Sequence, residues 1–353
     1  MKALIFGYGI TGQSIGRYLE KKGKVYEIYD ENLKGPNIFN TLPNRKKLDS
    51  YEMVYLSPGI NINKIYANGE FDGIEFLTDI DIFFKEDNSY KIGITGTNGK
   101  STCCYHLHQL LEESQLVGNI GTPVLDNINS SRYSIIELSS FQLEKIKEIH
   151  LDLGVLLNIS PDHIDHHLNF AEYKKVKNRI KESKKVTEES DPRKLWSMIT
   201  GRPQREKQNI ELKDLPHRHQ HIVTHDQMVF INDSKATNLT ALKFALKKIS
   251  KPYVLILCGD PDKEQYESFK IIGPRKIYIF GYHAEEISRK IFHTEKILFQ
   301  NQDLSSVMRS IFKETYESQI HILFSPGHPS GLDYKNFEER GDHFIKLAMR
   351  SND

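Results

Sequence analysis

The sequence predicts an α/β protein of 353 residues, built as three doubly wound blocks of parallel strands and covering helices. Three observations lead to this fold class. Short apolar runs typical of buried strands alternate with helical patterns along the chain. Glycine-rich turns follow the first strand of the first and second blocks. The length, at about 150 residues per domain, corresponds to two or three domains.

The first block opens with a strand, helix, strand unit. Residues 3–6 form a short apolar run, residues 11–22 have a helical pattern, and residues 24–29 form a second strand that ends at Asp30. This order indicates a parallel sheet with a crossover helix.

The second and third blocks repeat the pattern. In the second block, a strand at 90–95 leads through a glycine-rich turn into a helix from about 100 to 113, and strands follow at 133–138 and 154–159. The third block begins near residue 222, and its predicted strands are 253–258, 276–280, 296–299 and 319–324. Between residues 174 and 218 the chain is dense in Lys, Arg and Glu, and we predict a helix to about Lys185 followed by a polar connector.

The composition excludes several classes of protein. Lys and Arg total 48 and Asp and Glu total 47, so a net charge of +1 gives no bulk attraction to nucleic acid or to an anionic membrane. Three cysteines, two of them adjacent, give no disulfide framework and favour a reducing compartment. No run of 18 apolar residues occurs. We therefore expect a cytoplasmic monomer that acts on small molecules, without nucleic acid partners or membrane insertion.

The turn Gly7-Tyr8-Gly9-Ile10-Thr11-Gly12 follows the first strand, opens a helix, and is trailed by Asp30 at the end of the next strand. A dinucleotide-binding fingerprint occurs in this context. The glycines let the backbone approach a pyrophosphate, whose charge is met by amide groups and by the helix N-terminus. The pattern indicates a diphosphate without identifying it. A purely structural strand-to-helix turn is the alternative.

Residues 93–102, Gly-Ile-Thr-Gly-Thr-Asn-Gly-Lys-Ser-Thr, form a second and stronger phosphate-binding turn. Backbone amides would cradle the phosphates, Lys100 would offset their charge, and a hydroxyl of Ser101 or Thr102 would reach Mg²⁺. The spacing departs from the usual Walker pattern, because Ile94 stands five residues before Gly99. Two phosphate turns favour a ligase that handles ATP and a nucleotide-linked substrate over a dehydrogenase, which needs only the first.

A set of motifs, taken in order, resembles the ATP-dependent Mur ligase family of peptidoglycan synthesis. The motifs are residues 93–102, residues 118–121 (Gly-Asn-Ile-Gly), residues 137–143 (Glu-Leu-Ser-Ser-Phe-Gln-Leu) and residues 158–167 (Asn-Ile-Ser-Pro-Asp-His-Ile-Asp-His-His). Residues 7–14, 57–60 (Ser-Pro-Gly-Ile) and 336–341 (Asn-Phe-Glu-Glu-Arg-Gly) resemble the members that add D-glutamate. The matches cover the chain except its middle.

The resemblance implies an amide-bond-forming ligase. ATP would phosphorylate the alanyl carboxylate of UDP-N-acetylmuramoyl-L-alanine, and the amine of D-glutamate would attack the acyl phosphate to leave an amide and inorganic phosphate. Metal and cationic side chains must hold these crowded anions in line. The implied cofactors are ATP as co-substrate and Mg²⁺ at two sites, with a carbamylated lysine, and the implied partners are these small-molecule substrates.

The resemblance also assigns the nucleotide and metal residues. Those implied to contact ATP are Gly96, Thr97, Asn98, Gly99, Lys100, Ser101, Thr102, Arg218 and Asp233. Those implied to hold Mg²⁺ are Ser101, Glu137, His163 and Lys177 as a carbamate, and the implied catalytic residues are Lys100, Glu137, His163, Lys177 and Arg218. Glu137 ends a strand, where carboxylates commonly face the ligand crevice, and the alternative is a surface or capping glutamate.

The helix from Phe170 offers several lysines, and the family pattern selects Lys177. A tyrosine precedes Lys177 by four residues, and Arg-Ile follows two and three residues later. Carbamylation would turn this cation into an anion able to meet the second Mg²⁺, which requires a neutral amine. A solvated helix face is the alternative.

His163, Asp165, His166 and His167 suggest a zinc site only by ligand counting, because a fourth partner and cysteine support are lacking. By resemblance, only His163 matches a metal position of the family. We expect His166 and His167 to be solvated histidines at the start of a helix.

The other substrates are assigned by resemblance as well. Residues implied to bind the UDP-sugar are Gly9, Ile10, Thr11, Asp30, Ser57, Pro58, Gly59, Asn119 and Ser139. Residues implied to bind D-glutamate are Lys235, Thr237, Lys263, Ser330 and Phe337. Lys235 and Thr237 are expected at the start of a helix whose positive end suits an anion, and the structural alternative is an N-cap at Asp233 or Ser234. Residues 261–262 and Gly331 shift this region relative to the family pattern.

The largest departure from the family is a deletion. Members carry further strands and helices between the helix of Lys177 and the segment Leu215-Pro216-His217-Arg218, whereas this chain has only residues 182–214 there. A sheet that lacks strands exposes an edge or apolar surface. A short helix with Trp196, Met198 and Ile199 is expected to cover it.

The deletion leaves a second function open, a catalytically impaired relative that binds a nucleotide sugar as a scaffold or regulator. A third, addition of an amino acid to folate, is disfavoured because folate offers no diphosphate to the first glycine turn. We predict three domains that meet at the active site. They are a Rossmann-like UDP-sugar-binding domain (1–86), a P-loop ATP-binding domain (87–216) shortened after about residue 182, and a Rossmann-like amino-acid-binding domain (217–353).

Overall fold

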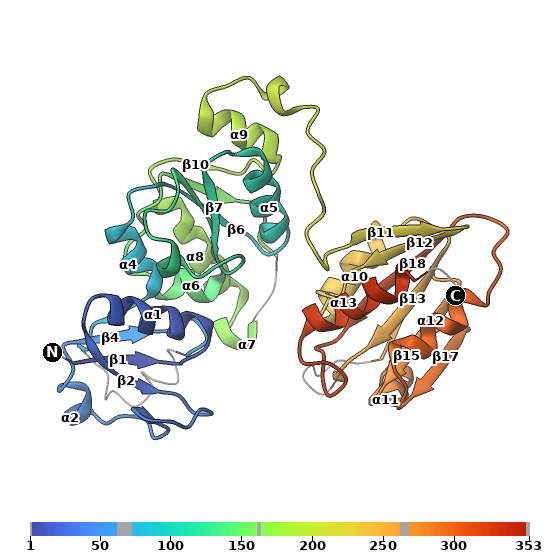
Figure 1. Cartoon of the computed structure of the whole chain (residues 1–353), viewed down its shortest axis with the longest axis horizontal. Helices are drawn as coiled ribbons and strands as arrows, with labels where there is room; N and C mark the ends of the chain where they lie inside the picture. The colour runs from blue at the N-terminus through green and yellow to red at the C-terminus, as the bar shows by residue number, and fades with distance from the viewer. Residues whose placement is uncertain (1, 62–72, 161–163, 262–267, 351–353) are drawn as a thin grey trace. The chain divides into compact units, whose positions relative to one another are not determined.

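The computed structural model describes residues 2–61, 73–160, 164–261 and 268–350. It is an α/β protein with parallel sheets, so the predicted fold class is confirmed (Figure 1). The chain divides into two compact units, Met1–Leu212 and Lys213–Asp353. Counted over the described residues, the first unit holds two five-stranded sheets, and the second holds a six-stranded sheet and a two-stranded sheet. The division into three domains stays a prediction.

The first sheet has the strand order β3-β2-β1-β4-β5, and all neighbouring pairs are parallel. Because β2 and β4 lie on opposite sides of β1, the chain reverses its winding there, and a crevice is expected at the carboxyl end of β1. The predicted glycine turn occupies that position. The elements are β1 (Lys2–Phe6), α1 (Ile10–Lys21), β2 (Val25–Tyr29), β3 (Ile38–Phe39), α2 (Arg45–Leu48), β4 (Met53–Leu56), β5 (Phe76–Leu77) and α4 (Asp79–Glu86).

The second sheet has the order β10-β9-β6-β8-β7 and is parallel throughout. Its winding reverses at β6, whose carboxyl end leads into the second glycine turn. The elements are β6 (Tyr90–Thr95), α5 (Lys100–Leu110), β7 (Ser114–Gly118), β8 (Tyr133–Glu137), α6 (Ser140–Lys145), β9 (Leu153–Leu156), α7 (Ile164–His167), α8 (Phe170–Asn178), β10 (Val186–Thr187) and α9 (Pro192–Thr200), with short 3₁₀ helices at Val124–Asn127, Arg179–Glu182 and Gln204–Lys207.

Two predictions for this sheet are wrong in detail. The helix expected to reach residue 113 ends at Leu110, and the unpredicted strand β7 follows at once. The helix expected to reach Lys185 ends at Asn178 and tightens into 3₁₀ geometry, after which the chain forms β10. Lys185 belongs to a sheet connection instead, because its carbonyl accepts a hydrogen bond of 2.8 Å from the Gly154 amide.

The short helix expected around Trp196 is present as α9. Asp191 caps it by accepting from the Arg193 amide, Pro192 occupies the first turn, and Gly201 ends it in the left-handed region at φ 71°. Trp196 is 2% exposed within the core shared with α5. Met198, in contrast, is 55% exposed, so it does not cover the sheet as expected.

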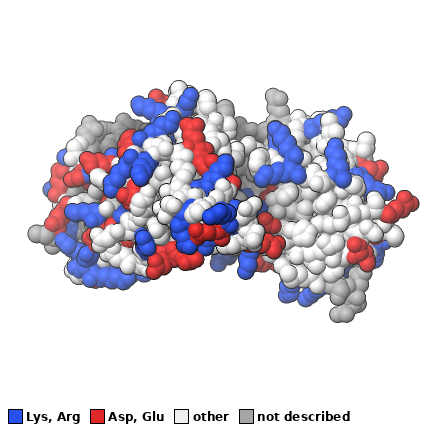
Figure 2. Space-filling model, turned by 90° about the horizontal axis from the view of Figure 1, so that it is seen from above, with Lys and Arg blue, Asp and Glu red and all other residues white. Residues whose placement is uncertain are grey.

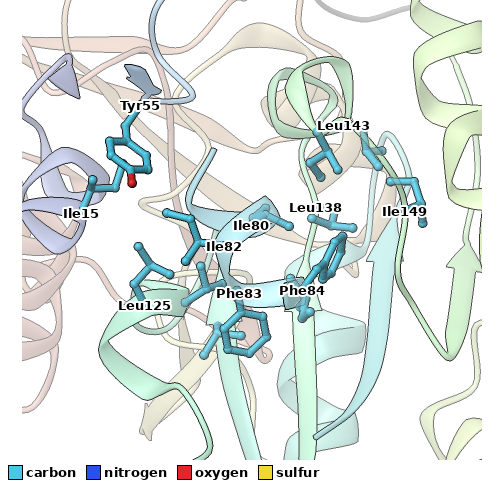
Figure 3. Packing of buried hydrophobic residues seen from close by; sticks show 14 of the residues in the cluster. Ile15, Tyr55, Ile80, Ile82, Phe83, Phe84, Leu125, Leu138, Leu143 and Ile149 are labelled. Carbon is cyan, nitrogen blue, oxygen red and sulfur yellow. The ribbon is translucent and has the colours of Figure 1, made fainter. Parts of the chain in front are cut away.

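One hydrophobic core joins the first two sheets (Figure 3). It includes Ile15 of α1, Ile80 and Phe83 of α4, and Leu138 beside the second sheet. Because α4 contributes to this shared core, the predicted boundary near residue 86 separates two sheets and not two cores. The merged core explains why residues 1–212 form one compact unit.

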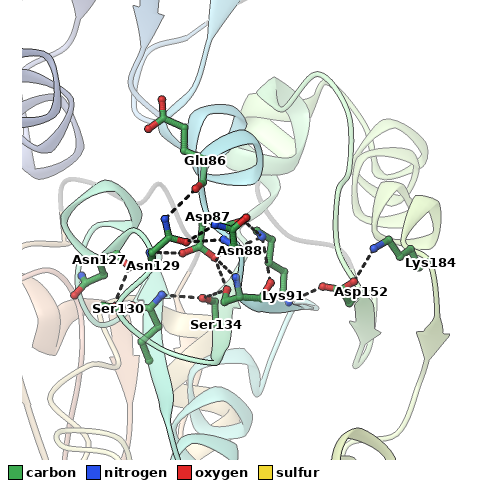
Figure 4. Close-up of polar contacts among 12 residues, drawn as sticks. Glu86, Asp87, Asn88, Lys91, Asn127, Asn129, Ser130, Ser134, Asp152 and Lys184 are labelled. Atoms are coloured by element: carbon green, nitrogen blue, oxygen red, sulfur yellow. Dashed lines mark hydrogen bonds and ion pairs between the residues drawn. The ribbon is translucent and has the colours of Figure 1, made fainter. Parts of the chain in front are cut away.

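A polar cluster follows α4 at the amino-terminal end of β6 (Figure 4). The Asn129 amide donates to Asp87 Oδ2 at 2.7 Å, and the Lys91 amide donates to Asp152 Oδ2 at 2.8 Å. Lys91 and Asp87 also form a buried ion pair at 3.5 Å. This network fixes the connection between the sheets at the end of β6 opposite to the glycine turn.

The second unit has the sheet order β11-β12-β18-β13-β15-β17, in which only the β11–β12 pair is antiparallel. α12 and α13 contribute to the core on one face, and α10 and α11 to the core on the other. The elements are β11 (Gln220–His225), β12 (Met228–Asn232), α10 (Leu239–Lys248), β13 (Tyr253–Cys258), β14 (Phe269–Lys270), β15 (Lys276–Gly281), α11 (Ala284–Lys290), β16 (Ile291–Phe292), β17 (Lys296–Gln300), α12 (Leu304–Phe312), β18 (Ile320–Gly327) and α13 (Phe337–Ala348).

Charged side chains of both signs are interspersed over the face of the molecule drawn in Figure 2. Among the described residues, no helix is both long enough and apolar enough to cross a membrane.

Candidate active site

The second glycine turn connects the buried strand β6 to helix α5. Gly99 caps α5 in the left-handed region at φ 83°, a conformation that favours glycine. Lys100 begins the helix, and its Nζ donates to the carbonyls of Gly96 at 2.8 Å and Thr97 at 2.9 Å. Ser101 is buried at 4% exposure. The residues predicted to bind ATP from Gly96 to Thr102 therefore form one loop and the first turn of one helix.

The segment after β9 forms hydrogen bonds with the loop of the second glycine turn. Asn158 Oδ1 accepts from the Asn98 amide and Asn158 Nδ2 donates to the Asn98 carbonyl, both at 2.9 Å. Thr97 Oγ1 accepts from the Ser160 amide at 3.0 Å and lies 3.1 Å from the Tyr173 hydroxyl. The loop is thus held in shape by protein contacts, a form of preorganisation for a charged ligand.

Lys177 reaches the same loop from α8. Its side chain is buried, with 1% exposure, and its Nζ donates to Thr95 Oγ1 at 3.0 Å and to the Gly96 carbonyl at 3.1 Å. The lysine predicted to carry CO₂ therefore lies beside the phosphate-binding turn, and the alternative of a solvated helix face is wrong for this residue. Its modification stays a prediction.

Glu137 is the last residue of β8, the strand next to β6. In the parallel pairing of these two strands, it lies opposite Ile94. It is 1% exposed, so it is not a surface residue. Glu137 Oε1 accepts from Asn119 Nδ2 at 2.8 Å, while Oε2 is buried and has no hydrogen-bond partner among the described residues. A buried carboxylate oxygen that lacks a donor favours a nearby cation. The carboxylate and the Ser101 hydroxyl are hard oxygen donors of the kind that Mg²⁺ prefers, so these residues fit the ion.

The first glycine turn is tightly packed. Gly7 has φ 80°, and a Cβ on Gly12 would lie 2.0 Å from the Gly7 carbonyl oxygen, so helix α1 can approach the turn only with glycine there. Asp30 Oδ2 accepts from the Tyr8 amide at 2.9 Å, and Ser57 Oγ donates to the Gly7 carbonyl at 2.7 Å. Burial raises the pKa of Asp30, but hydrogen bonds from three backbone amides outweigh it, so the pKa is lowered.

A cavity of about 500 Å³ opens at this turn. It is bounded by the first glycine turn, Asp30, the segment 57–60 and the start of the segment after β7. Of the residues predicted for the UDP-sugar, those that line it are Gly9, Ile10, Thr11, Asp30, Ser57, Pro58, Gly59 and Asn119. Ser139 does not line it and instead caps α6 by accepting from the Gln142 amide at 3.2 Å.

Asn119 links this cavity to the second glycine turn. It lines the cavity and donates a hydrogen bond to Glu137. Glu137 ends β8, which is the neighbour of β6, the strand that leads into the second glycine turn. The two predicted phosphate sites are therefore neighbours within one unit.

In the second unit, Asp233 and Arg218 lie on connected segments. Asp233 Oδ2 accepts from Ser325 Oγ at 2.8 Å, and its Oδ1 accepts from the His219 amide at 3.0 Å. Burial raises the pKa of Asp233 to about 6, and Arg218 is among the charges that oppose this shift. Asp233 therefore helps to fix the segment that follows β12.

The residues predicted for D-glutamate are brought together in part. Lys235 Nζ lies 3.5 Å from the centroid of the Phe337 ring, a cation–π contact. Ser330 follows β18, and the neighbouring Pro329 carbonyl accepts from the Asp260 amide at 2.9 Å. The expected helix start is wrong, because Asn238 caps α10 and the helix begins at Leu239, so Lys235 and Thr237 lie in the preceding turn.

Two predicted site residues, His163 and Lys263, lie outside the described residues. For the neighbouring histidines the expectation of solvation is wrong. His167 is 3% exposed, and His166 Nε2 lies 2.9 Å from Glu144 Oε2. Both residues end α7 rather than starting a helix.

Two residues that hold the site together were not assigned from the sequence. Asn158 belongs to a quoted motif, and its position after a buried strand next to β6 could have indicated it. Arg340 is 0% exposed, and its guanidinium donates to the carbonyls of Ser234 at 2.8 Å and His328 at 3.1 Å. Arg340 thereby joins the segments after β12 and β18, a contact between distant segments that sequence alone does not reveal.

Comparison with known proteins identifies relatives over the whole chain. The Mur ligase middle domain family matches residues 94–195. The UDP-N-acetylmuramoylalanine--D-glutamate ligase of Buchnera aphidicola subsp. Schizaphis graminum is 31% identical, and the alignment covers 99% of this chain and 98% of that protein. The protein of the same name from Saccharophagus degradans is 26% identical, with 97% and 96% covered.

The first of these alignments has 443 positions against 353 residues in this chain, so at least 90 positions hold no residue of it. The chain is therefore shorter than this relative, and the place of the missing positions at the centre of the chain stays a prediction.

Solved structures share the fold. The pseudomurein peptide ligase type C from Methanothermus fervidus has a TM-score of 0.54 and 14% identity, with 99% of this chain and 100% of that chain covered. The MurF ligase from Thermotoga maritima in complex with ADP has a TM-score of 0.52 and 13% identity, with 99% and 95% covered. Because one relative is 31% identical over nearly the whole of both proteins, the chain belongs to the Mur ligase family and is an ATP-dependent ligase that forms amide bonds.

Proposed function

We propose that the chain joins D-glutamate to UDP-N-acetylmuramoyl-L-alanine in the synthesis of peptidoglycan precursors, through an acyl phosphate. The names of the relatives support the choice of substrates. The observation that carries the proposal is the Asn119–Glu137 hydrogen bond, which connects the cavity of the first glycine turn to the second turn. A ligase of this type needs a diphosphate-linked acyl donor, whose carboxylate is phosphorylated, and a triphosphate next to each other.

The second glycine turn is proposed to bind the triphosphate. The loop amides and Lys100 would contact its phosphate oxygens, and Lys100 would exchange its contacts with the loop carbonyls for contacts with phosphate. Glu137 and the Ser101 hydroxyl would hold a Mg²⁺ ion, which supplies neutralisation of the phosphate charge. Since Glu137 Oε2 is buried and no described residue donates to it, this carboxylate is suited to a cation before any ligand binds.

Lys177 is proposed to be carbamylated and to serve the second Mg²⁺ position together with His163. The amine is buried beside Thr95 and Gly96, so a carbamate formed on it would lie against the phosphate-binding loop. Its negative charge would supply the anionic ligand that lysine itself cannot provide.

The cavity at the first glycine turn is proposed to bind the UDP-sugar. The turn presents backbone amides and the start of α1 to a diphosphate. Asp30 already accepts three backbone hydrogen bonds, so we propose that it mainly shapes the turn.

The second unit is proposed to contribute Arg218 and Asp233 to the nucleotide, and Lys235, Thr237, Lys263, Ser330 and Phe337 to D-glutamate. A dicarboxylate calls for a cation and hydroxyl donors, which this set contains. The cation–π contact would hold Lys235 in place next to Phe337.

The alternative is a relative that binds the nucleotide sugar without turnover. At least 90 positions of the alignment with the Buchnera protein hold no residue of this chain. A loss of that size favours the relative with impaired catalysis.

Release of phosphate in the presence of ATP, Mg²⁺, UDP-N-acetylmuramoyl-L-alanine and a panel of amino acids separates the two functions. If the chain is the ligase, phosphate release depends on both the UDP-sugar and D-glutamate, and Lys100→Ala abolishes it. Lys175→Ala, at an exposed lysine, is the control and should retain phosphate release. Binding of the UDP-sugar without phosphate release would favour the scaffold, and release indifferent to D-glutamate would contradict the proposed substrate.

A further inference from the structure

We propose that Glu144, His166 and His167 form a site for a zinc-class transition-metal ion, separate from the residues assigned to Mg²⁺. Each offers one ligand atom, and the three atoms lie within 4.8 Å of one another. The sequence does not link Glu144 to these histidines, because Glu144 is 22 residues from His166 and reaches it only through the fold.

The distances within the cluster suit one ion. Glu144 Oε2 lies 2.9 Å from His166 Nε2, and Glu144 Oε1 lies 3.8 Å from His167 Nδ1. Two ligands bound to one tetrahedral zinc at about 2.0–2.1 Å are about 3.3 Å apart. The observed separations lie on either side of that value and involve different oxygens of Glu144, so the carboxylate would rotate to place one oxygen in a bonding position with both imidazoles.

Two helices and two aromatic rings hold these side chains. Glu144 belongs to α6, whereas both histidines end α7. The Phe141 ring contacts both imidazoles, edge-on to His166 at 4.5 Å and stacked on His167 at 5.8 Å between centroids. The Tyr173 ring also contacts His167, at 5.4 Å between ring centroids. Such packing limits the rotation of the imidazoles, which favours binding of an ion without large rearrangement.

The donor set selects the ion. Two imidazoles and one carboxylate are ligands that zinc and cobalt accept in tetrahedral sites, whereas Mg²⁺ prefers six oxygens. Three protein ligands leave a fourth position for water. The side chains of His166 and Glu144 are 12% and 21% exposed, so an ion has access from solvent, while His167 is buried.

An ion here would tie α6 to α7 next to the phosphate-binding loop. Tyr173, which packs on His167, also lies 3.1 Å from Thr97 Oγ1. The proposed role is structural, and the site does not depend on the identity of the ligase substrates.

Titration of the full chain with Co²⁺ in the absence of nucleotide tests this site. We expect one equivalent to bind with the visible absorption of a tetrahedral Co²⁺ ion, to be displaced by Zn²⁺, and to persist in millimolar Mg²⁺. Glu144→Gln and His166→Gln should weaken binding by about 10- to 100-fold. Both residues are partly exposed, and circular dichroism will verify that the variants fold.

Two controls locate the ion. His150→Gln removes a histidine that also pairs with a glutamate, at 3.1 Å, but is 62% exposed. Glu137→Gln removes the carboxylate assigned to Mg²⁺. Both should leave Co²⁺ affinity unchanged. Absence of the tetrahedral spectrum, equal affinity in Glu144→Gln and His166→Gln, or loss of binding in Glu137→Gln would overturn the proposal.

Discussion

Glu137 illustrates how one residue can be unfavourable for the fold and suited to a reaction. Removing a carboxylate from water without a full set of donors opposes folding, and a cation at the site offsets that effect. In the part of the chain that the structure describes, no group donates to Glu137 Oε2, although Oε1 accepts a hydrogen bond from Asn119. This arrangement is expected where a metal ion binds with substrate.

Glu137→Gln keeps the shape of the side chain and removes its charge. We expect Mg²⁺-dependent phosphate release to fall by at least about 100-fold, whereas the melting temperature without ligand stays equal or rises. Steady-state kinetics and thermal unfolding measure the two effects. Glu148→Gln, in which the replaced residue is 78% exposed, is the control. Unchanged activity in Glu137→Gln would exclude it from metal binding.

Lys177 and Lys175 allow a comparison of two lysines on one helix. Lys177 is buried at the loop, whereas the Lys175 side chain is 78% exposed. We expect Lys177→Ala to abolish measurable phosphate release and Lys175→Ala to retain it. Depletion of bicarbonate should lower the activity of the unmodified sequence if the carbamate forms. Full activity without CO₂, with the lysine mass unmodified, would contradict the carbamate.

The sequence predicted the residues whose position follows from a strand end and a glycine turn, such as Lys100, Ser101 and Glu137. It did not predict that His167 is buried, because the partners of His167 come from α6 and α8, which only the tertiary structure brings close. Arg340 was missed for the same reason, whereas Asn158, which follows a buried strand, could have been found. The roles of His167 and Arg340 depend on which segments lie side by side.

Among the elements, helix α4 contributes to the hydrophobic core that the first two sheets share. Its first residue, Asp79, is a buried carboxylic acid. Asp79 is 3% exposed, and burial raises its pKa to about 7, although backbone donors of Asp79 and Ile80 oppose the shift. The folded-state pKa is above the unfolded value of about 3.9. The contribution of Asp79 to stability is therefore fully present below about pH 4 and is lost as the pH rises through about 7.

Asp79→Asn should remove this dependence. The variant is expected to gain stability relative to the parent as the pH rises from about 5 to 8, by on the order of 1 kcal/mol or more. Chemical denaturation at several pH values measures the difference. A difference that is constant with pH would show that Asp79 is not protonated in the folded state near neutral pH.

Helix α9 lies in the part of the chain that the sequence predicts to be shortened. Trp196→Ala should destabilise the protein by about 3–5 kcal/mol, because a large buried ring is removed. Met198→Ala, on the exposed face of the same helix, should change stability by less than about 0.5 kcal/mol. Denaturant unfolding compares the variants, and equal effects would contradict the assigned packing.

The long elements were predictable because they carry a clear period or a glycine turn at their ends, as in β6 and β13. Strands β7 and β10 were not, since β7 follows its helix almost without a break and β10 has two residues in a charged stretch. Their pairing is decided by the neighbouring strands and not by local propensity.

At the scale of the whole molecule, the chain consists of two units with separate cores. The second unit has a six-stranded sheet with helices contributing to cores on both faces. We expect residues 213–353, expressed alone, to unfold cooperatively, which thermal circular dichroism can measure. A fragment without a cooperative transition would show that this unit needs the rest of the chain to fold.

We propose that ATP drives amide formation through an acyl phosphate. Turnover of UDP-N-acetylmuramoyl-L-alanine whose terminal carboxylate carries ¹⁸O, in the presence of ATP and D-glutamate, tests for this intermediate. Attack of that carboxylate on the γ-phosphorus transfers one labelled oxygen to each phosphate released, and mass spectrometry of the phosphate and the amide product detects it. We predict one ¹⁸O per phosphate. Unlabelled phosphate, or phosphate release without an amide product, would contradict the account.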